Sequence, residues 1–217
     1  DHQQVLEVLC ILCLLDFYKS QFSHLQQHAE LASELCKLIG TSDKNNHIAS
    51  YQLLAAYHTG NHNLRQHLLK EIQDNIAPDN VASSYLVNPV MALSETEKND
   101  ALFYLNNAKK TVSSLKGPEA LECCFLSIEA AIHHKIWDIA SDFAKILILL
   151  IKDEQLPLFV MCAERVRILS QIALNNMTEN TRTELVDIFV SAKHVGLAIH
   201  LPAYKKALNL LQDPIQV

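Results

Sequence analysis

The sequence predicts an all-α protein built from antiparallel helical hairpins, with about 10–12 helices in all. Glycine is scarce, at 4 of 217 residues, whereas β-sheets and phosphate-binding loops need glycine-rich turns. Apolar residues recur every three or four positions along most of the chain, which is the spacing of one helix face. The abundant Leu, Ala, Gln, Lys and Glu also favour helix.

Breaks in this periodicity divide the chain into successive pairs of helices. Aligned positions in the second helix of each pair, Leu25, Arg65, Ala101 and Ala140, are 40, 36 and 39 residues apart. A period in the thirties with two helices per unit is typical of an α-solenoid. We therefore expect a single helical-repeat domain over residues 1–217, with hairpins at approximately 3–39, 46–75, 80–115, 119–151 and 156–211.

A few residues with strong preferences mark the expected helix ends. A break near residues 20–23 separates the first two helices, Gly40 suits the left-handed position after a helix, and Gly60 suits the turn inside a hairpin. Ser94–Glu97 and Thr181–Glu184 match the capping box that opens a helix.

Proline and further capping residues predict other boundaries. Gly117–Pro118 predicts the end of one unit and the first turn of the next. Pro89 interrupts the pattern of residues 81–93, so we expect that helix to be kinked or to end early. Residues 41–43 and Asp79 are placed to cap the helices that follow them, and Pro202 marks the start of the last helix.

The charge and the apolar stretches exclude two classes of partner. The formal net charge is −6, and no cluster of Lys and Arg is large enough to track a phosphate backbone, so we expect no direct nucleic-acid binding. The longest apolar stretches, residues 8–15 and 146–151, are far shorter than the ~20 residues of a membrane span. Because the chain begins with Asp1 and enters a helical pattern at once, we expect it to be a segment of a longer solenoid.

The six cysteines lie within predicted helices. Cys10 and Cys13 form a C-x-x-C pair inside an apolar run, with no second pair at zinc-site spacing, and we interpret them as buried thiols. Cys123 and Cys124 are interpreted as packing residues too. Reduced cysteines spread through helices indicate an intracellular protein, cytoplasmic or nuclear.

Eleven histidines raise the alternative of a helical bundle that binds a metal or ligand through histidine-rich turns. His24 and His28 are four residues apart, as are His58 and His62, but neither pair has the glutamate of a zinc-protease motif. We interpret them as solvated surface residues and expect no metal and no cofactor. With no nucleophile elbow or nucleotide loop in the sequence, we expect no catalytic residue and no enzymatic activity.

Residues 128–144 resemble a tetratricopeptide repeat (TPR). Trp137 precedes Ala140 by three residues, which is similar to the aromatic-x-x-Ala pattern at the start of the second helix in that family. Residues 57–62 and 17–22 are similar to the same segment. The resemblance extends over about two thirds of the chain and implies a right-handed superhelix with a concave peptide-binding groove.

We accordingly predict a non-catalytic protein–protein interaction scaffold, a TPR-like subunit or segment of a multiprotein complex. In a solenoid the first helix of each pair lines the concave face, where aromatic and amide side chains bind extended peptides. The tyrosines could instead fill gaps between stacked hairpins. The candidate partner-binding residues are Tyr51, Tyr57, Asn61, Tyr85, Tyr104 and His133.

Overall fold

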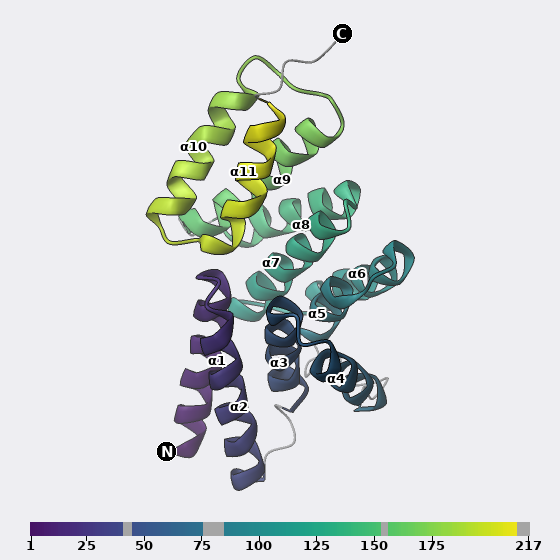
Figure 1. The fold of residues 1–217 in the computed structure, drawn as a ribbon, viewed down its shortest axis with the longest axis vertical. Coiled ribbons are helices and arrows are strands. Elements are labelled where there is room, and N and C mark those ends of the chain that lie inside the picture. Colours follow the sequence, from purple (N-terminus) through teal and green to yellow (C-terminus); the bar gives the residue numbers. More distant parts are fainter. Residues whose placement is uncertain (41–44, 76–84, 153–155, 212–217) are drawn as a thin grey trace.

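The computed structural model describes residues 1–40, 45–75, 85–152 and 156–211. These residues form eleven α-helices and one 3₁₀ turn, and no strand occurs among them (Figure 1). The all-α prediction and the expected number of helices are confirmed. The elements are α1 (His2–Tyr18), α2 (Phe22–Ile39), α3 (Asn45–Thr59), α4 (His62–Asn75), α5 (Val87–Ser94), α6 (Lys98–Val112), α7 (Pro118–His133), α8 (Trp137–Leu150), α9 (Pro157–Ala173), α10 (Thr181–His194), the 3₁₀ turn η2 (Ala198–His200) and α11 (Leu201–Leu210).

The helix boundaries expected at Gly40, Gly60, Gly117–Pro118 and Pro202 are also confirmed. Gly40 ends α2 in the left-handed conformation, and Gly60 has a positive φ between α3 and α4. Gly117 is the N-cap of α7, with Pro118 in its first turn. Pro202 lies in the first turn of α11. Local signals therefore predicted where most helices begin and end.

Five turns in the described part of the chain share one backbone geometry. In each, a residue with φ between +56° and +77° follows a helix, and the next N–H donates to the carbonyl five positions back, at 2.8–2.9 Å. This is the bond of the Schellman motif, which satisfies a carbonyl at the helix end. Only two of the five residues are glycine, so sequence alone did not reveal the recurrence. The residues with positive φ are Ser20, Gly60, Lys135, Asn175 and Gly196.

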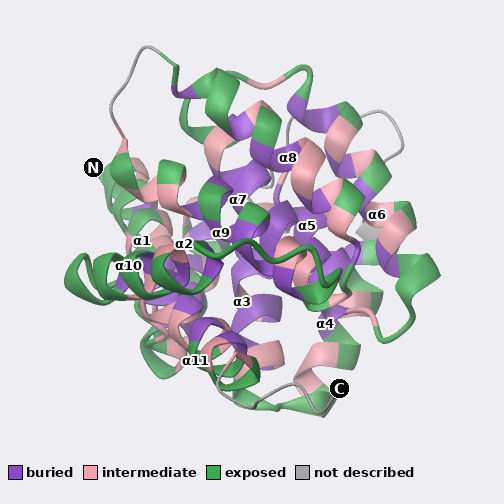
Figure 2. Cartoon of the chain, turned by 90° about the horizontal axis from the view of Figure 1, so that it is seen from above, coloured by how far each residue is buried: buried purple, intermediate pink, exposed green. Residues whose placement is uncertain are grey.

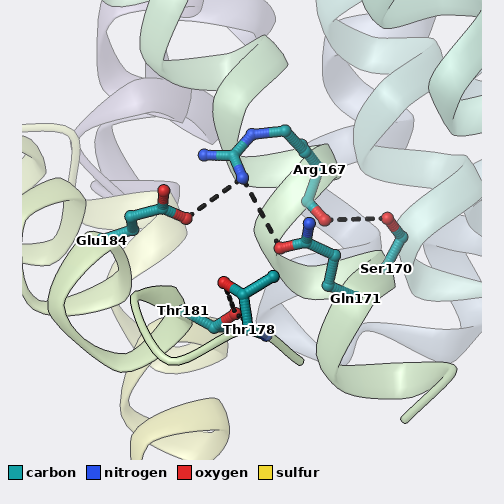
Figure 3. A network of polar contacts seen from close by, with 6 residues as sticks. All are labelled: Arg167, Ser170, Gln171, Thr178, Thr181 and Glu184. Atoms are coloured by element: carbon teal, nitrogen blue, oxygen red, sulfur yellow. Dashed lines mark hydrogen bonds and ion pairs between the residues drawn. The ribbon is translucent and has the colours of Figure 1, made fainter. Parts of the chain in front are cut away.

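Both expected capping boxes are wrong. Ser94 is the last residue of α5, its buried Oγ has no partner among the described residues, and α6 begins only at Lys98. Helix α10 does begin at Thr181, but Thr181 Oγ1 accepts from the backbone N–H of Thr178, at 2.8 Å. Glu184 binds Arg167 of α9 instead of its own helix end (Figure 3).

Pro89 neither kinks nor ends a helix. It is the third residue of α5, where an N–H would have no partner within the helix, so the proline ring is tolerated. The expected caps at residues 41–43 and Asp79 lie outside the described residues.

Successive helices pack against each other except for α4 and α5, and those near the middle also contact the helix after next. Helix α3 contacts α5, α5 contacts α7, and α7 contacts α9. Helix α7 lies at the centre of the apolar core, and 11 of its 16 residues are buried (Figure 2). The turn η2 returns to α1, so the N-terminal helix and a C-terminal turn meet beside this centre (Figure 1).

Phe125 of α7 forms the aromatic part of that junction. Its ring lies 4.6 Å from Tyr18 and 6.3 Å from Phe17 of α1, between ring centroids, and it stacks on His200 of η2 at 5.6 Å. One side chain thus contacts both ends of the described chain.

We expect Phe125→Ala to lower the free energy of unfolding by about 3–5 kcal/mol, because it leaves a cavity among three rings. Phe103→Ala makes the same chemical change on α6, where the side chain is 61% exposed, and should cost less than about 0.5 kcal/mol. Urea unfolding followed by circular dichroism measures both. Equal losses in the two variants would contradict the central role of Phe125.

The shared turn geometry gives a second expectation. Lys135→Gly should raise the free energy of unfolding by about 0.5–1 kcal/mol, because lysine is strained at positive φ. Gly60→Ala should lower the free energy of unfolding by about 1 kcal/mol through the same backbone strain. No steric clash adds to this loss, because a Cβ at residue 60 meets no atom within 4 Å. Lys135→Ala is the control and should change stability little. A Lys135→Gly protein less stable than the parent would refute the strain argument.

Candidate functional site

The structure separates the predicted partner-binding residues into pairs and single positions. Tyr51 is buried, only 2% exposed, and its hydroxyl donates to Glu122 Oε1 at 2.5 Å. The expectation of Tyr51 at a partner-binding surface is therefore wrong. Tyr85 is half-buried and donates to Glu122 Oε2 at 3.2 Å. For these two residues the packing interpretation holds.

The remaining four residues lie in three places. Tyr57 of α3 and His133 of α7 meet, with 3.1 Å between Tyr57 Oη and His133 Nε2. Asn61 is exposed at the start of α4, where its Oδ1 accepts from the backbone N–H of Leu64. Tyr104 is half-buried on α6, and its hydroxyl accepts from Gln73 at 3.4 Å. The six residues do not form one surface.

Glu122 is a buried carboxyl group with two tyrosine donors. Burial raises the pKa of Glu122 to about 7, although both tyrosine hydrogen bonds lower it. Burial and the nearby carboxylate also raise the pKa of Tyr51 and Tyr85, so both hydroxyls stay protonated and donate. The ring of His47 packs against both tyrosines. This arrangement stabilises the contact of α3 with α7.

A second buried polar cluster joins Glu129 of α7, Arg165 of α9 and His200 of η2. Arg165 Nη1 and His200 Nε2 both donate to Glu129 Oε1, the histidine at 2.8 Å. Burial alone would raise the pKa of Glu129, but Arg165 and His200 lower it to about 2. Burial and the guanidinium lower the pKa of His200 to about 4, so the imidazole is neutral at pH 7.

Sequence reasoning missed this cluster because its members lie 36 and 71 residues apart. One signal was available for Arg165. It shares a helix face with Cys162 and Leu169, three residues before and four after it, and both of these are buried. A charged residue on an apolar helix face requires a buried partner.

The histidines are less solvated than expected. His28 binds Asp16 of α1, with 2.7 Å between Nδ1 and Oδ2. His58 stacks on Phe22 at 4.2 Å between ring centroids, and burial lowers its pKa to about 4. The surface interpretation is wrong for these two, whereas His24 and His62 are exposed. In the described ranges, no group of three or more His, Cys, Asp or Glu side chains is placed to hold a metal ion.

The cysteine interpretation agrees with the structure. Cys13, Cys36, Cys123, Cys124 and Cys162 are buried, and Cys10 is half-buried. Burial raises the pKa of Cys13 and Cys124 to about 12, so both stay protonated at neutral pH. A protonated, buried thiol is a poor nucleophile.

An apolar hollow of the described surface lies along helices α8, α9 and α10. Two adjoining hollows of about 860 and 680 Å³ share Ile148, and we refer to them together as the interhelix groove. Leu149 is 71% exposed there and Val190 58%. Arg167, held by Glu184 and Gln171, lies at one edge (Figure 3). The main apolar lining residues are Ile148, Leu149, Val160, Met161, Val190 and Val195.

Helix α1 presents a second apolar surface, which we call the α1 outer face. It consists of Val5, Val8, Ile11 and Leu15, all exposed. Exposed apolar patches of this kind on soluble proteins mark interaction sites.

Comparison with known proteins adds no neighbour to this description. No family model, no curated protein and no solved structure matches the chain. Among the described helices, none combines the length and the apolar character needed to cross a lipid bilayer. The functional argument therefore rests on the geometry above.

Glu122 gives a pH-dependent prediction. Its pKa of about 7 lies above the ordinary 4.5, so the folded state holds the proton more tightly than the unfolded state. The stability that this provides is full below about pH 4.5 and is lost as the pH rises to about 7. The free energy of unfolding of Glu122→Gln minus that of the parent should therefore be higher at pH 8 than at pH 5, by roughly 2–3 kcal/mol. Urea unfolding at the two pH values measures this.

The control for that measurement is Glu97→Gln, because Glu97 is exposed before α6. Its stability should follow that of the parent at both pH values. If Glu122→Gln also follows the parent, Glu122 is not the buried titrating group.

Proposed function

We propose that the chain is a non-catalytic protein-interaction scaffold, a TPR-like helical-repeat subunit or segment of a multiprotein complex. The observation that carries the proposal is the interhelix groove, where apolar side chains of three helices are exposed together. Soluble monomers rarely expose large contiguous apolar patches unless these bind a partner. A single exposed leucine would need no such explanation.

The proposed occupant is an amphipathic helix of another protein. The groove is lined from Ser141 of α8 to Ile151, the residue after its end, which is roughly 15 Å at 1.5 Å per residue. That length accepts about three turns of a helix, whose apolar residues would lie between α8 and α9. Lys145 and Arg167 line the groove and would remain at the polar rim.

The packing of the helices supports the repeat part of the proposal. Contacts of α3 with α5, α5 with α7 and α7 with α9 are those that stacked helical pairs make. The shared turn geometry at Ser20, Gly60 and Lys135 adds a local feature that recurs inside three of the hairpins. In such an array, the α1 outer face would pack against a neighbouring helical pair or a partner subunit.

The proposed binding surface differs from the first expectation. Tyr51 is in the core, and Tyr57 and His133 lie on α3 and α7, away from the lining residues of the interhelix groove. The alternative of a metal-binding bundle gains no support from the described histidines.

The groove can be tested with Leu149→Glu/Val190→Glu. Both side chains are exposed, so the double variant should fold, while carboxylates in the groove should abolish capture of a partner. Phe103→Glu/Leu38→Glu is the matched control, with two exposed apolar residues changed elsewhere. Quantitative affinity purification should recover a protein with the parent and the control but not with the groove variant.

The recovered protein must then bind directly. Its purified helical segment should bind the parent chain and lose at least about 100-fold in affinity for the groove variant, which is about 2.7 kcal/mol. Equal recovery of every protein by groove and control variants, or turnover of a small substrate by the pure chain, would refute the proposed function.

A further inference from the structure

A separate cavity of about 290 Å³ lies near the centre of the molecule, distinct from the interhelix groove. Its walls come from α1, α3, α5 and α7 on one side, and from α9, η2 and α11 on the other. Tyr57 and His133 lie at its accessible side, where their side chains meet. The cavity has the size of the smallest ligand pockets, about 300 Å³.

Two residues of the lining, one on each side of the cavity, have buried nitrogen atoms that lack partners. Arg165 is 3% exposed, donates from Nη1 to Glu129, and has a buried Nε without a partner among the described residues. His58 Nε2 is also buried without a partner. Unpaired buried polar atoms are costly, and two of them on residues that line one cavity point to a ligand or water there.

The geometry of the guanidinium selects the kind of ligand. An arginine has five N–H donors in a planar fork, and the edge formed by Nε and Nη2 matches two carboxylate oxygens. Arg65 lies near the cavity mouth, with its guanidinium carbon 5.6 Å from the centre of the Tyr57 ring. Glu129, the one carboxyl group in the lining, already accepts hydrogen bonds from Arg165 and His200.

The other walls are apolar. Phe17, Leu93 and Ile132 line the cavity, together with Ile199 and Ala203. A ligand that satisfies both kinds of wall has one acidic group and a compact apolar body.

We propose that this cavity binds a small monocarboxylate. Its carboxylate would accept from the free edge of Arg165 and from His58, and its apolar body would pack against Phe17, Leu93 and Ile132. This site is independent of the interhelix groove and of the proposed scaffold function.

Charge balance makes the binding proton-linked. The Arg165–Glu129 pair is already neutral, so a bound anion leaves one uncompensated negative charge in the cavity. His58 neutralises it by taking a proton from solvent. The titratable groups that face His58 are Glu129 and His133 on α7, Arg165 on α9 and Tyr57 on α3. The affinity should rise by up to about tenfold for each pH unit between 7.5 and 6.

Benzoate and its neutral isostere benzamide are the probes. We expect saturable benzoate binding to the purified chain by titration calorimetry, with one proton taken up and with benzamide at least about tenfold weaker. Ala203→Phe should abolish binding by filling the cavity. His58→Gln should weaken binding at least about tenfold and remove the proton uptake. Lys205→Gln, exposed on the same helix as Ala203, should bind like the parent.

Three results would overturn the inference. The first is the absence of saturable benzoate binding, which would mean that the cavity holds only water. The second is benzamide binding as tight as that of benzoate, and the third is unchanged benzoate binding by His58→Gln. The Leu149→Glu/Val190→Glu variant should bind benzoate normally. A failure of the groove proposal and a failure of the cavity proposal are therefore distinguishable.

Discussion

The buried carboxylate of Glu129 is the constraint on which the centre of this fold depends. An ionised carboxylate inside a protein costs several kcal/mol unless a cation and further donors compensate for it. Arg165 supplies the charge and His200 a second hydrogen bond, and both come from the C-terminal part of the chain. The core around α7 is therefore complete only when α9 and η2 are docked on it. Phe125, one turn before Glu129, packs on His200 and joins the same elements through apolar contact.

Local physical chemistry explains which features were predictable. Glycine at Gly40 and Gly60, and proline at Pro118, restrict the backbone in ways that nearby residues do not alter, and the helix boundaries there agree with the structure. The capping box at Ser94–Glu97 failed because Ser94 is the last residue of α5, and the packing of the apolar residues of α5 outweighs a local hydrogen bond of about 1 kcal/mol. Where a local preference is that small, tertiary packing determines the helix boundary.

The candidate site could be predicted only in part, because its partners are distant in sequence. Tyr51 has the spacing of the apolar helix face of Ile48 and Leu54, but nothing near it indicates that Glu122, 71 residues later, accepts its hydroxyl. Tyr57 and His133 were both selected, but their contact depends on how α3 and α7 meet. The interhelix groove was not predicted at all, because periodicity shows that Ile148 and Leu149 are apolar without showing which side of α8 is covered.

Helix α9 carries an inversion of the usual pattern, and this links the two proposals. Its inward face holds the charged Arg165, while Val160 on its outward face lies in the apolar groove. Folding alone favours the reverse, with the cation in water and the valine in the core. Proteins depart from that rule chiefly at functional sites, where the departure is compensated elsewhere. Here Glu129 compensates the buried cation, and the proposed partner would cover Val160 together with the other exposed apolar residues of the groove.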